Sequence, residues 1–454
     1  MADRHHASEH LLGWLKPWRV EGVTAERLGA ILVIAVLWDV VLSFDGNGSI
    51  GKGWFPLILT VTSYPALATV AALTLSQPMT QFITRLRPRR CLTVVRPLLV
   101  IVFLGLLAQA PSYLQAKAPV LNDVTPSAVC AARTVLRDHD PYVEPELLCL
   151  HQLHLSYYAA TPLRAGVFTD LKVAPDPTQM THLARQAAKN HYHSAAIAKF
   201  GYPPMAFVWM LPVALLGRAW WAAWTMLAAL LFLFLAGLLS GRWWWATVCI
   251  LCLQWGTGSV LSDATQGSVE FFACALIALS LMSISSPRRS AIALGLAIAT
   301  NPLAWVITPA YLLFSARLPA LRERLVWLAA TGIVAIVPWL FIYHDAAGGI
   351  WRLLTQPEFA GGIGLAGFLL GIGLIAPSTL LSGAFLVAEI ANLAAARYWR
   401  RMLPAAPLLA IALFWLDSRG LAGYLSQLPL LACATAIGLW RLERDTAAPH
   451  ASPL

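Results

Sequence analysis

Residues 84–90 read TRLRPRR and lie between two long apolar runs, 55–76 and 96–114. Together with Arg96, this connection carries five arginines: Arg85, Arg87, Arg89, Arg90 and Arg96. A helix needs about 20 apolar residues to cross a bilayer, and short loops rich in arginine stay in the cytoplasm. The stretch therefore predicts a cytoplasmic loop between two membrane spans, with the chain emerging outside after residue 115.

The composition of the whole chain agrees with this prediction. Of the 454 residues, 58% are hydrophobic and only 12% are charged. An ordinary soluble domain has about twice that fraction of charged residues, so the composition excludes disordered, collagen-like and ordinary soluble proteins. The net charge of +10 comes from short basic runs that flank apolar runs. Such runs indicate membrane topology rather than nucleic-acid binding.

The pattern predicts an all-α polytopic membrane protein with roughly 10 to 13 transmembrane segments. After a cytoplasmic tail (1–26) and three spans within 27–115, an extracytoplasmic segment covers 116–202, a second bundle covers 203–441, and a cytoplasmic tail covers 442–454. No cleavable signal peptide is evident. The spans expected in the second bundle are 203–217, 220–240, 267–285, 325–343, 378–396 and 421–440.

Two apolar runs of the second bundle are interrupted. The run 290–316 has basic residues on both flanks and is broken by Asn301-Pro302, which predicts two half-helices that enter the membrane and return. The run 243–266 is broken at 256–258 and has the same pattern on the outer side. The runs 361–377 and 403–416 are short.

The extracytoplasmic segment concentrates polar chemistry, with seven of the 22 acids and six of the 11 histidines. Cys130 and Cys149 both lie in it, where an oxidising environment would allow a disulfide. The sequence leaves open whether they form a disulfide or remain free thiols. Histidines 151, 154, 191 and 193 lack acid or cysteine partners at zinc-ligand spacing. Cys249 and Cys252 lie in an apolar run and are expected to pack in the core. We therefore expect no cofactor.

Motifs follow one another in this segment in a fixed order. Asn122-Asp123 comes just after the third span, and Ala131-Ala132-Arg133 follows. Asp138-His139-Asp140-Pro141-Tyr142 comes next, and Tyr202-Pro203-Pro204 opens the following apolar run. In order and topology these motifs resemble glycosyltransferase family 87, a family of integral-membrane glycosyltransferases of the GT-C class.

Three weaker motifs extend the resemblance to Pro429. They are LSDATQGSVEF (261–271), LGLAIATNPLAWVITP (294–309) and SRGLAGYLSQLP (418–429). The resemblance implies a GT-C-like bundle and a polyprenyl-phosphate sugar donor used on the outer face of the bacterial cytoplasmic (inner) membrane. Mannose is the expected sugar, with arabinose or another sugar as alternatives. The implied acceptor is an extracytoplasmic glycolipid or glycan. We expect a monomer in the lipid bilayer, without a nucleic-acid partner.

The chemistry of such a transfer assigns roles to individual residues. A carboxylate must take the proton of the acceptor hydroxyl, and Asp123 is our candidate. Alternatively, Asp123 or Thr125 is the N-cap of a helix expected over 127–136. Cations must hold the donor phosphate, for which the candidates are Lys199, His344, Arg352 and Arg419, with His191 and His193 as further choices. Candidates for sugar or acceptor binding are Asp138, Asp140, Tyr142, Tyr202, Gln266, Asn301 and Tyr424.

Asp138 and Asp140 allow two interpretations. An Asp-x-Asp pair can hold a divalent metal for a nucleotide-sugar donor, but a lipid monophosphate donor has no such need. Asp-Pro-Tyr is also a common turn, and we favour the turn. A different class of function, a transporter or lipid flippase, would account for the broken helices. A related lipid-dependent transferase or ligase on the same scaffold is a third hypothesis.

Overall fold

A computed structural model gives the fold. It describes residues 124–144, 146–153, 178, 182, 199–217, 220–240, 268–355, 361–362, 365, 369, 378–398, 400–417, 419–420 and 427–447. The first three predicted spans, the loop 84–90 and the run 243–266 lie outside the described residues.

The regular secondary structure of the described residues is helical apart from one short parallel pairing. The helices are α6 (Val124–Val135), α7 (Leu147–Gln152), α10 (Met205–Val208), α11 (Leu211–Leu216), α12 (Trp221–Ser240), α15 (Glu270–Met282), α16 (Pro287–Thr300), α17 (Leu303–Ser315), α18 (Leu321–Ile342), α19 (Ala346–Thr355), α21 (Ser378–Tyr398), η6 (Arg400–Ala405), α22 (Ala406–Ala412), η7 (Leu413–Leu416) and α24 (Leu428–Ala447). The strands β1 (Gly361–Gly362) and β2 (Arg419–Gly420) pair in parallel. The helical fold class is confirmed.

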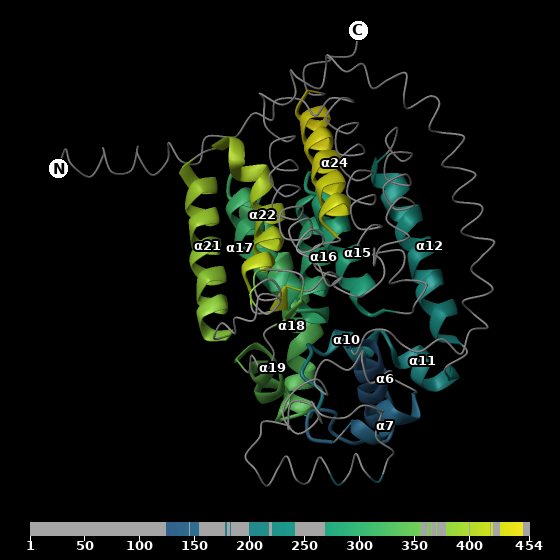
Figure 1. Ribbon diagram of the computed structural model, residues 1–454. Helices are drawn as coiled ribbons and strands as arrows, with labels where there is room; N and C mark the ends of the chain where they lie inside the picture. Colours follow the sequence, from purple (N-terminus) through teal and green to yellow (C-terminus); the bar gives the residue numbers. More distant parts are fainter. Residues whose placement is uncertain are drawn as a thin grey trace, which may run out of the picture.

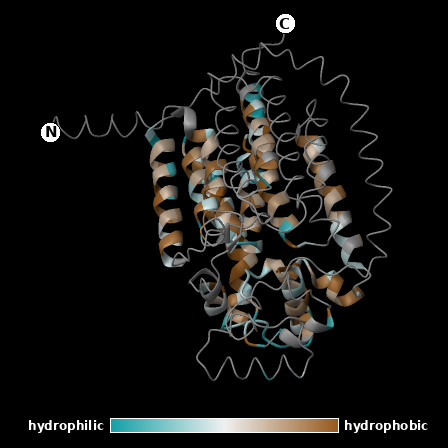
Figure 2. Cartoon of the chain, viewed as in Figure 1, coloured by the Kyte–Doolittle hydropathy of each residue, from teal (hydrophilic) through white to brown (hydrophobic). Residues whose placement is uncertain are grey.

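Two described helices, α18 and α21, are long and apolar enough to cross a membrane. Only 6% of the apolar window of α18 and 22% of that of α21 is buried. Core helices of soluble proteins are mostly buried, so these exposed apolar surfaces favour contact with lipid. Figure 2 shows the apolar colouring along both helices, with polar residues at the upper ends of α21 and α24.

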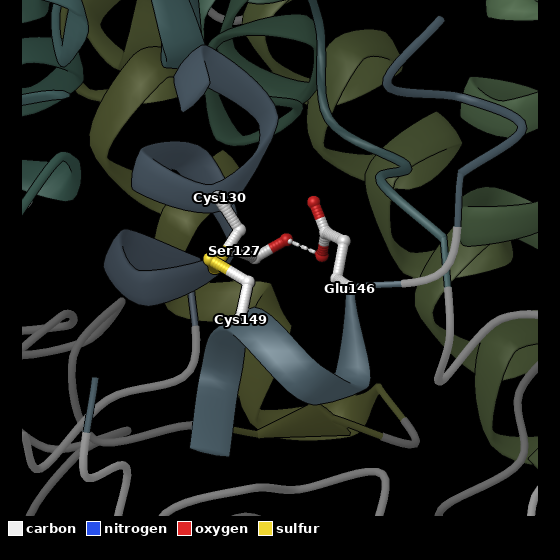
Figure 3. Close-up of a disulfide and its surroundings, with 4 residues drawn as sticks. All are labelled: Ser127, Cys130, Glu146 and Cys149. Carbon is white, nitrogen blue, oxygen red and sulfur yellow. Dashed lines mark hydrogen bonds between the residues drawn. A yellow bond between two sulfur atoms is a disulfide. The ribbon is translucent and has the colours of Figure 1, made fainter. Parts of the chain in front are cut away.

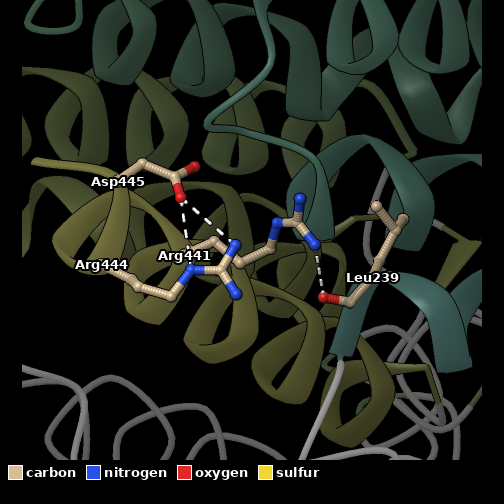
Figure 4. Close-up of polar contacts among 4 residues, drawn as sticks. All are labelled: Leu239, Arg441, Arg444 and Asp445. Atoms are coloured by element: carbon tan, nitrogen blue, oxygen red, sulfur yellow. Dashed lines mark hydrogen bonds and ion pairs between the residues drawn. The ribbon is translucent and has the colours of Figure 1, made fainter. Parts of the chain in front are cut away.

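Arginines from helices far apart in sequence gather at one end of the bundle, which we call the arginine end. Arg441 of α24 donates from Nη1 to the carbonyl oxygen of Leu239 in α12, at 2.7 Å (Figure 4). Arg289, at the start of α16, is a charged neighbour of Arg441. Arg444 pairs with Asp445 at 3.3 Å. The basic termini of α16 and α24, which the sequence predicts on one side of a membrane, thus lie together.

Arg324 of α18 also belongs to the arginine end, but it is only 1% exposed. Its Nη2 donates to the carbonyl oxygen of Ile284, just beyond the C-terminus of α15. The partial negative charge of a helix C-terminus favours a cation at that place. Arg324 therefore connects α18 to the end of α15. From the sequence, this arginine is expected only as one of the basic residues that flank an apolar run on its cytoplasmic side.

A second group of short helices, α6, α7, α10, α11 and α19, lies at the opposite end of the bundle and is called here the α6 assembly (Figure 1). The start of α15 is tied to it because the Val269 N–H donates to Thr125 Oγ1 at 3.0 Å. The end of α16 is tied to it by Trp209, whose Nε1 donates to Thr300 Oγ1 at 2.9 Å. Helices α15 and α16 therefore run between the two ends of the bundle.

The predicted break within 290–316 is confirmed. Helix α16 ends at Thr300, Asn301 is extended, and α17 begins at Leu303. The Asn301 Oδ1 accepts the Leu303 N–H at 2.9 Å and caps the new helix. Because α16 starts and α17 ends at the arginine end, the pair leaves that end and returns to it. Neither helix, at 14 and 13 residues, is long enough to cross a bilayer alone.

Two predictions about segments at the α6 assembly were wrong. The run 203–217 is no single span but consists of α10 and α11, four and six residues long. Pro204 precedes α10, Trp209 and Met210 separate the two helices, and Gly217 with its positive φ (91°) ends α11. Both helices contact α6. The stretch 344–359 around Arg352 has no apolar run of spanning length and is expected to be a loop, but it contains α19, in which the Arg352 backbone lies.

Gly438 permits the close crossing of α24 over α15. A Cβ at this position would overlap the Leu281 carbonyl oxygen and approach Ile284 Cγ2 to 2.9 Å. Backbone cannot yield as a flexible side chain can, so Gly438→Ala is expected to lower the free energy of unfolding by about 1–3 kcal/mol. Thermal unfolding of the purified protein in detergent measures the change. Gly332→Ala is the control, because nothing lies within 4 Å of that Cβ; equal effects in both variants would contradict the prediction.

Candidate functional site

The loop that follows α6 is shaped by its two aspartates. Asp138 is exposed and adopts a left-handed backbone (φ 61°), a conformation that Asp and Asn tolerate better than most residues. The Asp140 Oδ1 accepts the Tyr142 N–H at 2.8 Å, which closes an Asx turn. The turn interpretation of the Asp-x-Asp-Pro-Tyr motif is thus confirmed.

Tyr142 anchors this loop and is completely buried. Its hydroxyl donates to the Tyr202 carbonyl oxygen at 3.0 Å, and its ring lies 5.4 Å from that of Phe200. A Cβ on Gly349 of α19 would approach the Tyr142 ring to 2.7 Å, so only glycine fits there. Tyr142, which the sequence offered as a sugar contact, therefore holds three segments together, while Tyr202 contributes its backbone.

Tyr343 connects this loop to the end of α18. Its ring lies 6.5 Å from that of Tyr142 and stacks with that of Trp339 at 6.1 Å. Trp339 in turn packs edge-on against Phe207 of α10. Aromatic contacts of this kind add to the stability gained from burial. They fix the end of α18 against the motif 138–142.

Titratable residues from three stretches far apart in sequence lie within electrostatic range of one another around Asp140. This Asp140 cluster consists of Asp140, Lys199, Tyr343, His344 and Asp345. Partial burial raises the pKa of the Asp140 carboxyl, and Asp345 also raises it. The Tyr142 N–H, His344 and Lys199 lower this pKa. Burial, followed by the charges of Asp140 and Asp138, raises the pKa of Tyr343.

The cluster brings together residues that the sequence predicted separately. Lys199 and His344 were candidates for phosphate binding, and Asp140 was a candidate for sugar binding. Within the described part of the chain, Lys199 and Asp140 make no direct ion pair. Asp345 was not predicted, although its position next to His344 was a usable signal.

The described ranges contain no set of three or more His, Cys, Asp or Glu side chains placed to hold a metal ion. The Asp140 cluster contains carboxylates, an ammonium and an imidazole. Such a set can accept hydrogen bonds from sugar hydroxyls and donate to phosphate oxygens.

A disulfide joins Cys130 of α6 to Cys149 of α7 (Figure 3). The sequence left this pairing open, and the structure contains it. Beside it, Ser127 Oγ donates to Glu146 Oε2 at 2.6 Å, so a hydrogen bond and a covalent bond both connect the two helices. The closed loop includes the motif 138–142 and hence Asp140.

Glu146 is an acid that the sequence analysis missed. It is 4% exposed, and its Oε1 is buried without a hydrogen-bond partner. Burial raises the pKa of this carboxyl well above its ordinary value, and the hydrogen bond from Ser127 opposes this only in part. A buried neutral acid is a marker of functional or strained sites. Sequence alone gives no signal for it, because acids in polar stretches are usually solvated.

The protonation of Glu146 predicts a pH dependence of stability. The folded protein holds a proton that the unfolded chain releases above about pH 4.5, so the free energy of unfolding falls as the pH rises from that point. The slope is at most about 1.4 kcal/mol per pH unit, and it ends at the pKa of the folded state.

Glu146→Gln keeps the shape of the side chain but cannot ionise, so this component of the slope should disappear. Thermal unfolding midpoints over a pH series test this, with Glu144→Gln as control because the Glu144 side chain is 46% exposed. A slope that survives in Glu146→Gln would refute the assignment.

The other predicted residues are placed as follows. Asp123, Gln266 and Tyr424 lie outside the described residues, as do histidines 154, 191 and 193 and cysteines 249 and 252. Arg419 lies in β2 and Arg352 in α19. Asn301 is buried, 4% exposed, and its side-chain oxygen Oδ1 caps α17.

Helix α6 begins at Val124, the residue after Asp123, and so starts three residues earlier than predicted. Thr125 therefore lies inside the helix and cannot be its N-cap. Its hydroxyl accepts the Val269 N–H instead.

Comparisons of the chain with known protein families, with curated proteins and with solved structures find no match.

Proposed function

We propose that the chain is an integral-membrane glycosyltransferase that moves a sugar from a polyprenyl-phosphate donor to an extracytoplasmic glycolipid or glycan. The observation that supports the proposal is the Asp140 cluster, in which the charges of Lys199 and His344 act on the Asp140 carboxyl. A carboxylate beside cations at the end of apolar helices suits a ligand with a polar sugar phosphate and an apolar tail.

The position of the cluster supports an extracytoplasmic site. It lies in the α6 assembly, at the opposite end of the bundle from the arginine end, and arginine-rich ends face the cytoplasm (Figure 1). The disulfide Cys130–Cys149 lies on the same side as the cluster, and disulfides persist in oxidising compartments. In this proposal the chain is a GT-C-like bundle of roughly 10 to 13 spans in the bacterial inner membrane.

The proposed reaction is a single displacement. The acceptor hydroxyl oxygen bonds to the anomeric carbon, the bond from that carbon to the phosphate oxygen breaks, and polyprenyl phosphate leaves. Asp123 receives the hydroxyl proton. Lys199 and His344, with Arg352 and Arg419, offset the charge on the leaving phosphate. Because no enzyme nucleophile intervenes, the configuration at the anomeric carbon inverts.

An assay with a radiolabelled donor tests the proposal. Purified protein in lipid vesicles is given polyprenyl phosphate carrying labelled mannose and a total lipid extract as the acceptor. We expect label in a new glycolipid, with weaker donor binding in Lys199→Gln. Label that remains on the intact donor, with every lipid fraction and sugar donor tried, would overturn the proposal.

A transporter or flippase is the second candidate function, and one observation favours it. Glu389 of α21 is an acid in the middle of an apolar helix that can span a membrane, and it is only 7% exposed. Acids in such positions commonly line transport pathways. In the same vesicles, a transporter would move the labelled donor between leaflets without forming a covalent product.

A further inference from the structure

Helix α21 presents one polar stripe among its apolar faces. Its exposed face carries large apolar side chains, including Leu386, Val387 and Ile390, each more than half exposed. The buried face carries Glu389 and Asn392 one turn apart, at 7% and 9% exposure. Glu389 is the only acid between Ser378 and Tyr398. The carboxyl therefore faces the bundle, while the opposite face suits lipid.

Glu389 lies near the middle of the helix. It is separated from both helix ends by roughly 15 Å, from the rise per residue of an α-helix. At this depth in a membrane-spanning helix, the surroundings cannot solvate a charge. The cost of ionisation therefore depends on the groups that touch the carboxyl.

The contacts of Glu389 are few. Asn392 Nδ2 donates to Glu389 Oε2 at 3.2 Å and to the Ala406 carbonyl oxygen of α22 at 3.1 Å. The other carboxyl oxygen, Oε1, is buried and has no hydrogen-bond partner. Among the described residues, the Asn392 amide is the one polar group that contacts this carboxyl, and it is shared with the Ala406 carbonyl oxygen.

The elements packed against α21 supply little charge. Among the described elements, those with substantial contacts are α17, α22, η6 and η7. Helices α17, α22 and η7 contain no Asp, Glu, Lys, Arg or His, and η6 begins with Arg400 and Arg401. Asp417, which follows η7, accepts a hydrogen bond from Ser382 Oγ at 3.0 Å, near the other end of α21. A cationic partner at Glu389 is therefore not provided by α17, α22 or η7.

We propose that Glu389 is a proton-binding site inside the membrane, where the carboxyl carries a proton on Oε1 and exchanges it reversibly. Protonation removes the unpaired charge and leaves only a hydroxyl without an acceptor, which is the smaller penalty. Loss of the proton leaves an anion between α21 and α22, held by the single Asn392 amide. The protonation state thereby controls the packing of α21 on α22. This site is independent of the glycosyltransferase proposal.

Dicyclohexylcarbodiimide tests the protonation state directly. This apolar reagent adds to protonated carboxyls, whose proton passes to its nitrogen as the carboxyl oxygen bonds to its central carbon. The full-length protein in lipid vesicles is treated over a series of pH values, and mass spectrometry with fragmentation locates the adduct. We expect labelling of Glu389 that falls about tenfold per pH unit once the acid begins to release its proton.

Two variants and a second measurement keep the test decisive. Glu389→Gln should lose the adduct, while Glu323→Gln, which removes an exposed acid of α18, should leave it unchanged. Infrared difference spectra of the wild type minus Glu389→Gln should contain the carbonyl band of a protonated carboxyl. This band is seen whether or not the reagent reaches the site. Carboxylate bands in its place, at neutral pH, would overturn the proposal and would favour a bound metal cation such as sodium.

Discussion

The exchange Asp123→Asn is expected to slow sugar transfer by about 100- to 10,000-fold, the range measured for the loss of a general base. Asparagine has nearly the shape of aspartate but cannot accept the proton of the acceptor hydroxyl. The fold should survive under either of the two roles considered for Asp123, because Asn is as good an N-cap as Asp. This separates the catalytic role from the capping role.

Initial rates with labelled donor measure the loss, and equilibrium binding of the donor shows whether the substrate still reaches the site. Asp445→Asn is a matched control, because the Asp445 side chain is 45% exposed and lies at the arginine end, away from the candidate site. We expect this control to keep its activity. Turnover in Asp123→Asn within a few-fold of wild type would refute the assignment of the base.

Apolar runs, and the residues that interrupt them, predicted the longer helices well. The expected spans 220–240, 325–343 and 378–396 correspond to α12, α18 and α21 within a few residues. In lipid, a continuous apolar run can pair all its backbone N–H and C=O groups within the segment only as a helix. The local sequence is therefore enough to predict these helices. The break at residues 301–302 was equally local, because proline and its preceding residue interrupt a helix wherever they lie.

The Asp140 cluster was predictable only in part. The sequence supplied Asp140, Lys199 and His344 as separate candidates, but they are 59 and 145 residues apart in sequence, so no local pattern shows that they meet. The contacts that bring them together are long-range: Tyr142 with the Tyr202 carbonyl, and the Tyr142 ring with Tyr343. Sequence patterns with helical or strand periodicity carry no information about such contacts.

Burial of charged residues was the other feature that sequence did not predict. Arg324 and Glu146 are typical solvent-facing residues by type, yet they are 1% and 4% exposed. Each is buried because of a partner distant in sequence: the Ile284 carbonyl for Arg324 and Ser127 for Glu146. Residue type gives only a prior for exposure, and tertiary packing decides it.

Removing the disulfide with the double exchange Cys130→Ser and Cys149→Ser is expected to destabilise the α6 assembly by about 3 kcal/mol. The cross-link closes a loop with a sequence separation of 19, which restricts the unfolded chain. Without it, α7 keeps the bond from Ser127 to Glu146 and its few contacts with α6. Local opening of the segment should therefore precede unfolding of the bundle.

This opening should also lower sugar transfer, because Asp140 lies between the two cysteines and depends on the folded loop for its place beside Lys199 and His344. Limited proteolysis at the exposed Arg137 reports the opening, and thermal unfolding reports the loss of stability. Reductant should bring wild type to the behaviour of the variant and leave the variant unchanged, which separates the disulfide from the serine substitutions. If cleavage at Arg137 and the unfolding midpoint both stay at wild-type values, the loop is held by Tyr142 and Glu146 rather than by the covalent bond.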